Sequence, residues 1–332
     1  MLMTKQIAKW ASKGCPKLLC GLMPLFFLIL AVSPVSFAGV DAMPHLRLGA
    51  GARSIGLGGA FTAIADDATA TVWNPAGLGS AADLSLNLST QQLDLDRSHN
   101  FIALTKALGS AGSIGLAVVN AGVSGIPQYD NQANHQGEFD YSANAYSLSY
   151  GVGLGNFNIG LTGRMLMDNF GLDSVENQSG FGGVDVGLMG HALHIDVGEE
   201  KVPTFHYGVV AKYLGASLGD DTVPMVVNLG LAYNLYMGNV VTFAADVEHE
   251  LVNLDESATS LRLGTEYTIV TYKSTALSIR GGVKASRDVQ NLFGGFGVNI
   301  SGLQIDYAIQ DGMASEINGV GSTHFASLSY RF

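Results

Sequence analysis

The residues that could do chemistry gather near the start of the chain, where glycines and paired acids occur close together. Gly56, Gly58 and Gly59 suggest a nucleotide-binding loop, and Asp66 with Asp67 could supply two carboxylates. A dinucleotide-binding loop needs the spacing G-x-G-x-x-G between a strand and a helix, and the third glycine is missing here. Adjacent aspartates do not converge on one substrate without a partner, and no histidine is close to them in sequence. We therefore interpret both motifs as structural.

The histidines and cysteines give no readable catalytic or metal site. The two histidines with the closest spacing, His191 and His194, would face opposite sides of one predicted strand. No set of His, Asp and Glu has the spacing of metal ligands, and no serine lies in a nucleophile elbow. Both cysteines, Cys15 and Cys20, fall in the leader described next, so the remaining chain has no cysteine nucleophile and no disulfide. We expect no enzyme, no metal and no cofactor.

Residues 1–38 have the pattern of a secretory signal peptide. Four lysines are followed by an apolar run over residues 18–32 and then by Ser36-Phe37-Ala38, a small-x-small cleavage pattern. The alternative is an uncleaved anchor, but the run contains Pro24 and is shorter than the roughly 20 residues that span a bilayer. Cleavage would remove four of the 17 basic residues and no acid, leaving 13 basic against 28 acidic residues, a net charge of −15. Nucleic acid is therefore not an expected partner.

From residue 82 onward, apolar residues alternate with small or polar ones. In the stretch 227–235 the odd positions are large and apolar, whereas the even positions are Asn, Gly or Ala. Alternation with a period of two indicates strands with one apolar and one polar face. About fourteen such segments lie near residues 83–93, 99–107, 111–121, 143–152, 156–167, 181–195, 204–215, 223–236, 239–249, 259–270, 274–285, 291–300, 302–311 and 322–332.

The lengths of these segments and of their connections favour a membrane barrel. Roughly 9–11 residues are enough for a tilted strand to cross a bilayer, and only a closed sheet pairs all of its backbone groups in lipid. The connections alternate between short turns and longer loops, the longest near 122–142 and 168–180. The exception is 197–203, a longer turn on the side of the short ones. Outer-membrane barrels combine short periplasmic turns with longer external loops.

We therefore predict an all-β, antiparallel transmembrane barrel of about 14 strands over residues 82–332, in the outer membrane of a Gram-negative bacterium. Its expected partners are outer-membrane lipid and the barrel-insertion machinery. The chain stops on Phe332, and Leu328, Tyr330 and Phe332 share one face of the last segment. This ending resembles the C-terminal signature by which such barrels are recognised for insertion.

Residues 39–81 lack this alternation and are predicted to form a small N-terminal plug. An alanine-rich stretch could form a short helix that Asn74-Pro75 breaks. The segment resembles the N-terminus of PorV/PorQ-type proteins, within the wider group of FadL-like barrels, and parts of the later strands resemble that group as well. The resemblance implies a fourteen-stranded barrel whose lumen is plugged near its periplasmic end. The motif residues that carry it are Arg53, Gly56, Gly58, Gly59, Asp66, Asp67, Asn74, Pro75, Ala76 and Gly77.

The polar face of the last six segments carries charges that would line the lumen. Opposite charges fall on neighbouring strands, where they could pair. They could form a network that stiffens the barrel, a docking site for the plug through Arg53 or Asp66-Asp67, or a selective constriction. Glycine and alanine at other inward positions would leave room for the plug. The charged residues are Asp246, Glu248, Arg262, Glu266, Arg280, Lys284 and Asp306.

Two non-enzymatic functions remain open. The resemblance to PorV/PorQ-type proteins implies handling of cargo at the outer membrane, associated with type IX secretion, with secretion components or exported proteins as partners. The alternative is a FadL-like uptake channel for hydrophobic small molecules. The two long loops mix aromatic with acidic and amide residues, a surface suited to protein contact as much as to lipid capture.

Overall fold

A computed structural model describes the chain from residue 43 to its end, apart from short gaps. The described residues are 43–93, 96–172, 175–197, 200–219, 221–251, 257–270, 275–286, 290–312 and 322–332. The predicted signal peptide, its boundary at residue 38 and both cysteines lie outside this range and stay predictions.

Fourteen antiparallel strands form one closed barrel, which confirms the predicted fold class and strand number. Closure is made by β1, which pairs with β2 on one side and with β16 on the other. The short strands β8 (Ser217–Leu218) and β9 (Asp221–Thr222) form a separate two-stranded sheet. The barrel strands are β1 (Leu84–Gln92), β2 (Arg97–Ala107), β3 (Ser113–Tyr129), β4 (His135–Gly153), β5 (Phe157–Asn169), β6 (Gln178–Val197), β7 (Glu200–Leu214), β10 (Met225–Tyr236), β11 (Val240–Leu251), β12 (Ser257–Val270), β13 (Thr275–Ser286), β14 (Gln290–Ile300), β15 (Leu303–Gly312) and β16 (Thr323–Arg331).

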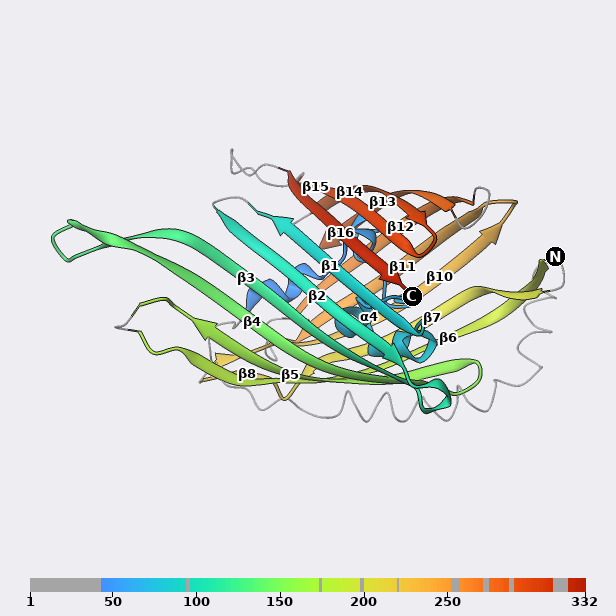
Figure 1. Cartoon of the computed structure of the whole chain (residues 1–332), viewed down its shortest axis with the longest axis horizontal. Helices are drawn as coiled ribbons and strands as arrows, with labels where there is room; N and C mark the ends of the chain where they lie inside the picture. The colour runs from blue at the N-terminus through green and yellow to red at the C-terminus, as the bar shows by residue number, and fades with distance from the viewer. Residues whose placement is uncertain are drawn as a thin grey trace. The chain divides into compact units, whose positions relative to one another are not determined.

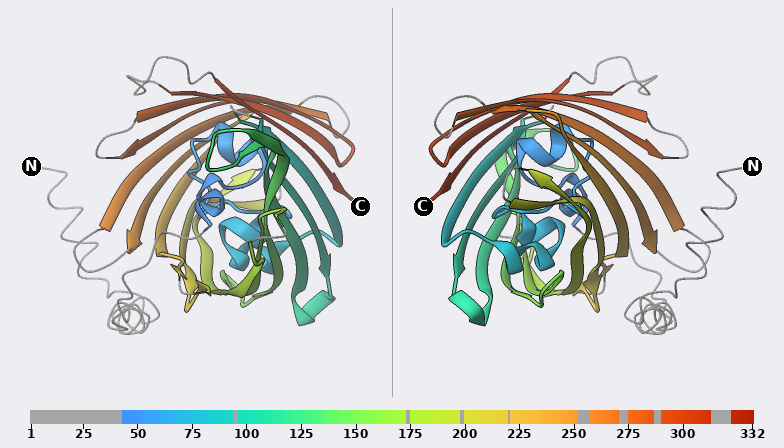
Figure 2. Two further views of the ribbon diagram at one scale, coloured as in Figure 1. Left: turned by 90° about the vertical axis from the view of Figure 1, so that its left-hand side faces the viewer. Right: turned by 90° about the vertical axis from the view of Figure 1, so that its right-hand side faces the viewer.

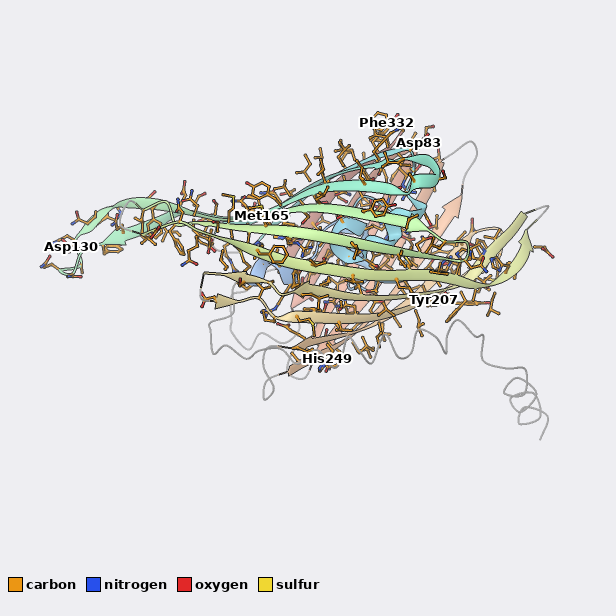
Figure 3. The ribbon with its side chains drawn as sticks, turned by 90° about the horizontal axis from the view of Figure 1, so that it is seen from below. Asp83, Asp130, Met165, Tyr207, His249 and Phe332 are labelled. Atoms are coloured by element: carbon orange, nitrogen blue, oxygen red, sulfur yellow. The ribbon has the colours of Figure 1, made fainter. Side chains whose placement is uncertain are left out.

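Two predicted connections prove to be strand instead. The stretch 122–142 is not a loop, because β3 and β4 continue as a hairpin that extends beyond the neighbouring strands, with Asp130 at its tip (Figures 1 and 3). Likewise, β6 and β7 remain paired to Val197 and Glu200, where a longer turn was expected. In both hairpins cross-strand pairing continues past the end of the apolar face, so the period of two does not mark where the strand stops.

The two ends of the barrel differ in their connections. We call the end that carries the tip of the β3–β4 hairpin external and the opposite end periplasmic, since short turns in outer-membrane barrels lie in the periplasm. The β2–β3 turn contains only the 3-10 helix η3 (Gly109–Ala111), and β14 and β15 are joined by two residues, Ser301 and Gly302.

A belt of large apolar side chains points away from the lumen. Met165 on the outer wall, for example, is 59% exposed (Figure 3). Ile279 is 63% exposed. Such a surface is costly in water but matches hydrocarbon, and closure leaves no unpaired strand edge. The chain is therefore a transmembrane β-barrel of the outer membrane. Belt residues on successive strands include Leu88, Ile102, Leu116, Leu148, Leu161, Val186, Leu231, Phe243, Leu263, Ile279, Phe296, Ile305 and Leu328.

Residues 43–80, called the inner segment below, lie inside the ring of strands (Figure 2). The segment contains the 3-10 helices η1 (Pro44–Leu48) and η2 (Pro75–Ser80) and the short α-helices α3 (Ala52–Gly56) and α4 (Ala70–Trp73). Helix α4 ends at Trp73, just before Asn74-Pro75, as predicted. The Asn74 side chain accepts a hydrogen bond from the backbone N–H of Ala76. No helix among the described residues has the length and apolarity to cross a membrane.

Glycines of the barrel wall allow the inner segment to pack directly against the strands. A Cβ atom on Gly282 would lie 2.2 Å from the Gly58 nitrogen, and one on Gly208 would lie 2.3 Å from the Thr62 oxygen. Only glycine permits this approach, because the atoms that would be struck belong to the backbone. Wall glycines where a Cβ atom would come within 3.0 Å of the inner segment include Gly151, Gly160, Gly187, Gly208, Gly230, Gly264 and Gly282, on seven strands.

Candidate functional site

One side of the lumen carries a network of buried charges, called the charged arc below. Arg280 on β13 lies 2.5 Å from Glu266 on β12 and 2.7 Å from Asp306 on β15. Nearer the external end, Glu248 on β11 pairs with Arg262, and Lys284 lies 3.9 Å from the same carboxylate. The charged arc consists of Asp246, Glu248, Arg262, Glu266, Arg280, Lys284 and Asp306, all facing inward as the alternation predicted.

The charged arc also binds the inner segment. Arg53 of α3 donates to Glu266 at 3.3 Å and to Asp66 at 2.5 Å, so one guanidinium joins the barrel to two parts of the chain. Asp246 accepts the backbone N–H groups of Phe61 at 3.0 Å and Thr62 at 2.9 Å. Network and docking site therefore share Glu266, whereas Asp246 adds an attachment outside the ion pairs.

The aspartates of the N-terminal motif lie at the periplasmic side of this site. Asp66 is partly exposed, and its carboxylate lies 3.5 Å from Arg331 at the end of β16. Asp67 lies 3.9 Å from Arg53 and accepts hydrogen bonds from the backbone and hydroxyl of Thr69. The structural interpretation of both aspartates fits these contacts. The carboxylate of Asp67 holds a turn, and that of Asp66 takes part in ion pairs with Arg53 and Arg331.

The remaining motif residues fix the path of the inner segment. Asn74 donates to the Thr62 carbonyl at 2.9 Å and to the Leu188 carbonyl of β6 at 3.2 Å. Gly58 and Gly59 have positive φ angles of 67° and 77°, a conformation that other residues rarely adopt. The other motif residues pack closely: Gly56 against Arg280, Pro75 and Ala76 against Gly160, and Gly77 against Ala65.

The opposite side of the lumen is apolar in its external half, and we call it the apolar arc. It packs against Met43 and Leu46 of the inner segment. No hydrogen bond or ion pair among the described residues joins a side chain of this arc to the inner segment, because its side chains have no polar atoms. The apolar arc consists of Phe101 and Ala103 of β2, Ala117 and Val119 of β3, Ala143 and Ala145 of β4, and Leu166 of β5, all buried.

Helix η1 connects the two arcs. The His45 ring lies 6.2 Å from the His99 ring on β2, the Leu46 carbonyl accepts from the Tyr213 hydroxyl of β7 at 3.2 Å, and Arg47 pairs with Glu250 on β11. Burial lowers the pKa of His45 to about 4, so its imidazole is neutral at neutral pH. Next to η1, a small recess is lined by Leu46 and Trp73 of the inner segment and by the charged side chains of Lys212, Glu248 and Arg262.

Sequence reasoning missed a second ion pair in the first half of the barrel. Arg164 on β5 donates two hydrogen bonds to Asp185 on β6, at 3.1 and 2.8 Å, and Asp185 also accepts the backbone N–H of Tyr213 at 2.9 Å. Both charged side chains stand at inward positions between outward apolar residues, which is the signal that could have revealed them. Lys212 of β7 was missed as well. Its side chain is buried, and its ammonium nitrogen lies 5.9 Å from the centroid of the Trp73 ring.

The prediction that His191 and His194 face opposite sides of a strand is wrong. Their ring centroids are 5.4 Å apart. Leu193 between them has a φ of 53°, and this left-handed residue interrupts the alternation so that both rings reach the same side. His206, paired with His191 on the adjacent strand, adds a third ring at 6.5 Å from His191. Within the described ranges, no group of three or more His, Cys, Asp or Glu residues is arranged to hold a metal ion.

The C-terminal residues form part of the barrel seam. Leu328 and Tyr330 lie on β16 opposite Leu88 and Leu86 of β1. The backbone N–H of Phe332 donates to the Leu84 carbonyl at 3.0 Å, and the Phe332 side chain is 67% exposed. The role of Leu328, Tyr330 and Phe332 as an insertion signal stays a prediction.

Comparison with solved structures finds similar barrels of known function. The toluene transporter TbuX of Ralstonia pickettii has a TM-score of 0.56 at 15% identity, covering 86% of this chain and 98% of that chain. The monoaromatic hydrocarbon channel CymD has a TM-score of 0.57 at 13% identity, covering 85% and 97%. A FadL homologue of Pseudomonas aeruginosa has a TM-score of 0.52 at 9% identity, covering 89% and 100%.

These similarities establish the fold of a FadL-like outer-membrane barrel of Gram-negative bacteria, and at such identities they establish the fold alone. No family model matches the chain. No curated protein matches it either. The narrower resemblance to PorV/PorQ-type proteins has no support from any of the comparisons and stays a prediction.

Proposed function

We propose that this protein is a non-enzymatic uptake channel for small hydrophobic molecules, with the inner segment as its plug. The observation that carries the proposal is the division of the lumen. A hydrophobic molecule entering from outside would meet the buried apolar arc, from Phe101 to Leu166, whose side chains hold the inner segment by packing alone. Burial in an apolar environment favours such a molecule by about 25 cal/mol for each Å² removed from water.

The similar structures support this proposal over the secretion-associated one. TbuX is a toluene transporter, and CymD and TodX are monoaromatic hydrocarbon channels. The sequence alone favoured cargo handling, and the order of the two hypotheses is now reversed. The plug would be held by the charged arc and would yield along the apolar arc, where packing is its only attachment.

Uptake of radiolabelled toluene into vesicles containing the purified protein tests the proposal. Val119→Asp places a charge in the apolar arc and should lower uptake by about 10-fold or more, because an ion in an apolar site is costly. Ser110→Asp adds the same charge at the exposed β2–β3 turn and should leave uptake unchanged. Vesicles that take up toluene no faster than protein-free vesicles contradict the proposal.

Handling of exported proteins remains a second candidate because of the β3–β4 hairpin. Beyond Val123 and Ser142 this hairpin is paired with neither β2 nor β5, and it carries the exposed Tyr129 next to Asp130. Such a projecting aromatic and acidic ribbon suits protein contact. Deletion of residues 126–139 should abolish co-purification with exported proteins while toluene uptake continues. Unchanged co-purification would remove the observation that favours this candidate.

A further inference from the structure

Three polar side chains meet at the edge of the apolar arc, just below the external end of the barrel. Gln91 of β1 and His99 of β2 are directly opposite each other in the strand register and both face the lumen. The exposed fractions of Gln91 and His99 are 2% and 1%. His45 of η1 covers them from the inner side, with its ring centroid 6.2 Å from that of His99.

These side chains carry buried polar atoms that no other part of the described chain binds. The Gln91 Oε1, the His45 Nε2 and at least one ring nitrogen of His99 have no hydrogen-bond partner among the described residues. The His99 ring also contacts the His45 backbone, and the Gln91 amide nitrogen donates to the Gly49 carbonyl at 3.2 Å. Each unsatisfied buried group costs about 1–3 kcal/mol. Packing alone does not explain the cluster, because leucine or phenylalanine would fill the same space without that cost.

The surroundings identify the chemistry that the cluster suits. Met43 and Leu46 flank His45 in sequence, Phe101 follows His99 on the same face of β2, and all three belong to the apolar core of the lumen. The nearest charged residue on that face, Arg97, lies at the exposed rim. The low pKa of His45, about 4, leaves its ring neutral at neutral pH. The cluster therefore offers neutral donors and acceptors in an apolar setting.

We infer that Gln91, His99 and His45 form a binding site for the neutral polar group of an otherwise apolar ligand, such as the hydroxyl of a phenol or an alcohol. The inference rests on the proposed uptake function and narrows its substrate class. A hydroxyl both donates and accepts, as does a neutral imidazole, so one hydroxyl can satisfy a ring nitrogen and the Gln91 oxygen together. A hydrocarbon satisfies neither. The ring of the ligand rests on the apolar arc, and η1 shifts to admit it.

Binding of p-cresol and toluene to the full chain, purified in detergent, tests the inference. The two ligands differ only by one hydroxyl, and equilibrium dialysis measures both affinities. We expect p-cresol to bind about 10-fold more tightly than toluene, the value of one well-made hydrogen bond. His99→Phe and Gln91→Leu should each remove this difference while toluene affinity changes less than 2-fold. Phe101→Leu, the apolar neighbour, should keep the difference and weaken both ligands alike.

The possible outcomes separate this inference from the proposed function. Toluene binding without a preference for p-cresol, the result expected if the cluster binds only ordered water, overturns the inference and leaves the uptake function intact. A preference that survives both substitutions also overturns it. Failure of the wild-type protein to bind either ligand overturns both. Heat-modifiable mobility verifies folding, and since the two substitutions lie on different strands, one misfolded variant does not prevent the test.

Discussion

The two sides of the lumen hold the inner segment in different ways. The charged arc binds it through directional contacts, such as Arg53 with Glu266 and Asp246 with two backbone N–H groups. The apolar arc touches it only through packing, around Met43 and Leu46. Hydrogen bonds and ion pairs in a buried setting are specific and costly to break singly, whereas apolar contacts exchange one partner for another at little cost. Under the proposed uptake function, this difference assigns anchoring of the inner segment to the charged arc and passage of the ligand to the apolar arc.

The largest expected effect comes from removing the centre of the charged arc. Arg280→Leu leaves the buried Asp306 carboxylate without a cation and leaves Glu266 with Arg53 alone, at a cost of about 3–5 kcal/mol in the free energy of unfolding. Urea unfolding in detergent measures it. Lys284→Leu, on the same face of β13 but partly exposed and 3.9 Å from its carboxylate, should cost less than about 1 kcal/mol. Equal costs for the two variants contradict the anchoring role.

A larger side chain at one of these wall glycines should have the next largest effect on stability. Gly282→Val would drive side-chain atoms into the Gly58 backbone and displace the inner segment, at about 1–3 kcal/mol. Conductance in planar bilayers should rise as the lumen opens. Gly281→Val is the matched control, since a Cβ atom there meets nothing within 4 Å on the outer wall. An unchanged conductance of the Gly282 variant would mean that the inner segment does not close the lumen.

Asp246→Ala should weaken one attachment without disturbing the ion pairs. It leaves the N–H groups of Phe61 and Thr62 unpaired, and we expect a loss of about 2 kcal/mol. Hydrogen exchange measured by mass spectrometry should increase over residues 58–64 but not over η1. Asp246→Asn keeps an acceptor oxygen and should restore part of the protection. Faster exchange in η1 as well would show that the two arcs are not independent.

The smallest expected effect is a loss of stability at acidic pH, where η1 should detach from the apolar arc. The folded pKa of His45, about 4, lies below its ordinary value of 6.5, so the unfolded form binds the proton more readily. Stability is complete above pH 6.5 and falls as the pH drops from 6.5 towards 4, by about 1 kcal/mol at pH 5.5. Hydrogen exchange over residues 43–48 should accelerate accordingly in the wild type. In the His45→Phe variant, hydrogen exchange over residues 43–48 should depend less on pH than in the wild type. The same pH dependence in both proteins would contradict the role of His45.

The sequence by itself determined the wall of the barrel. A period of two in segments such as 227–235 fixes which side chains face lipid, and that rule needs only the geometry of one strand. The inward direction of Arg280 and Asp306 and the end of α4 before Asn74-Pro75 followed from local pattern. The number of strands followed from the alternating segments together with the family resemblance. Where one residue broke the local geometry, as Leu193 does between two histidines, the pattern gave the wrong face.

Tertiary structure alone decided what the inward residues bind. Arg53 and Glu266 are 213 positions apart, and no spacing rule connects them. The same holds for His45 and His99, which meet because η1 folds back into the lumen. A strand pattern predicts which way a side chain points. Which residue that side chain contacts depends on closure of the sheet and on the path of the inner segment across it. For this reason the sequence predicted charges in the lumen, whereas the division into an anchoring and an apolar side emerged only from the fold.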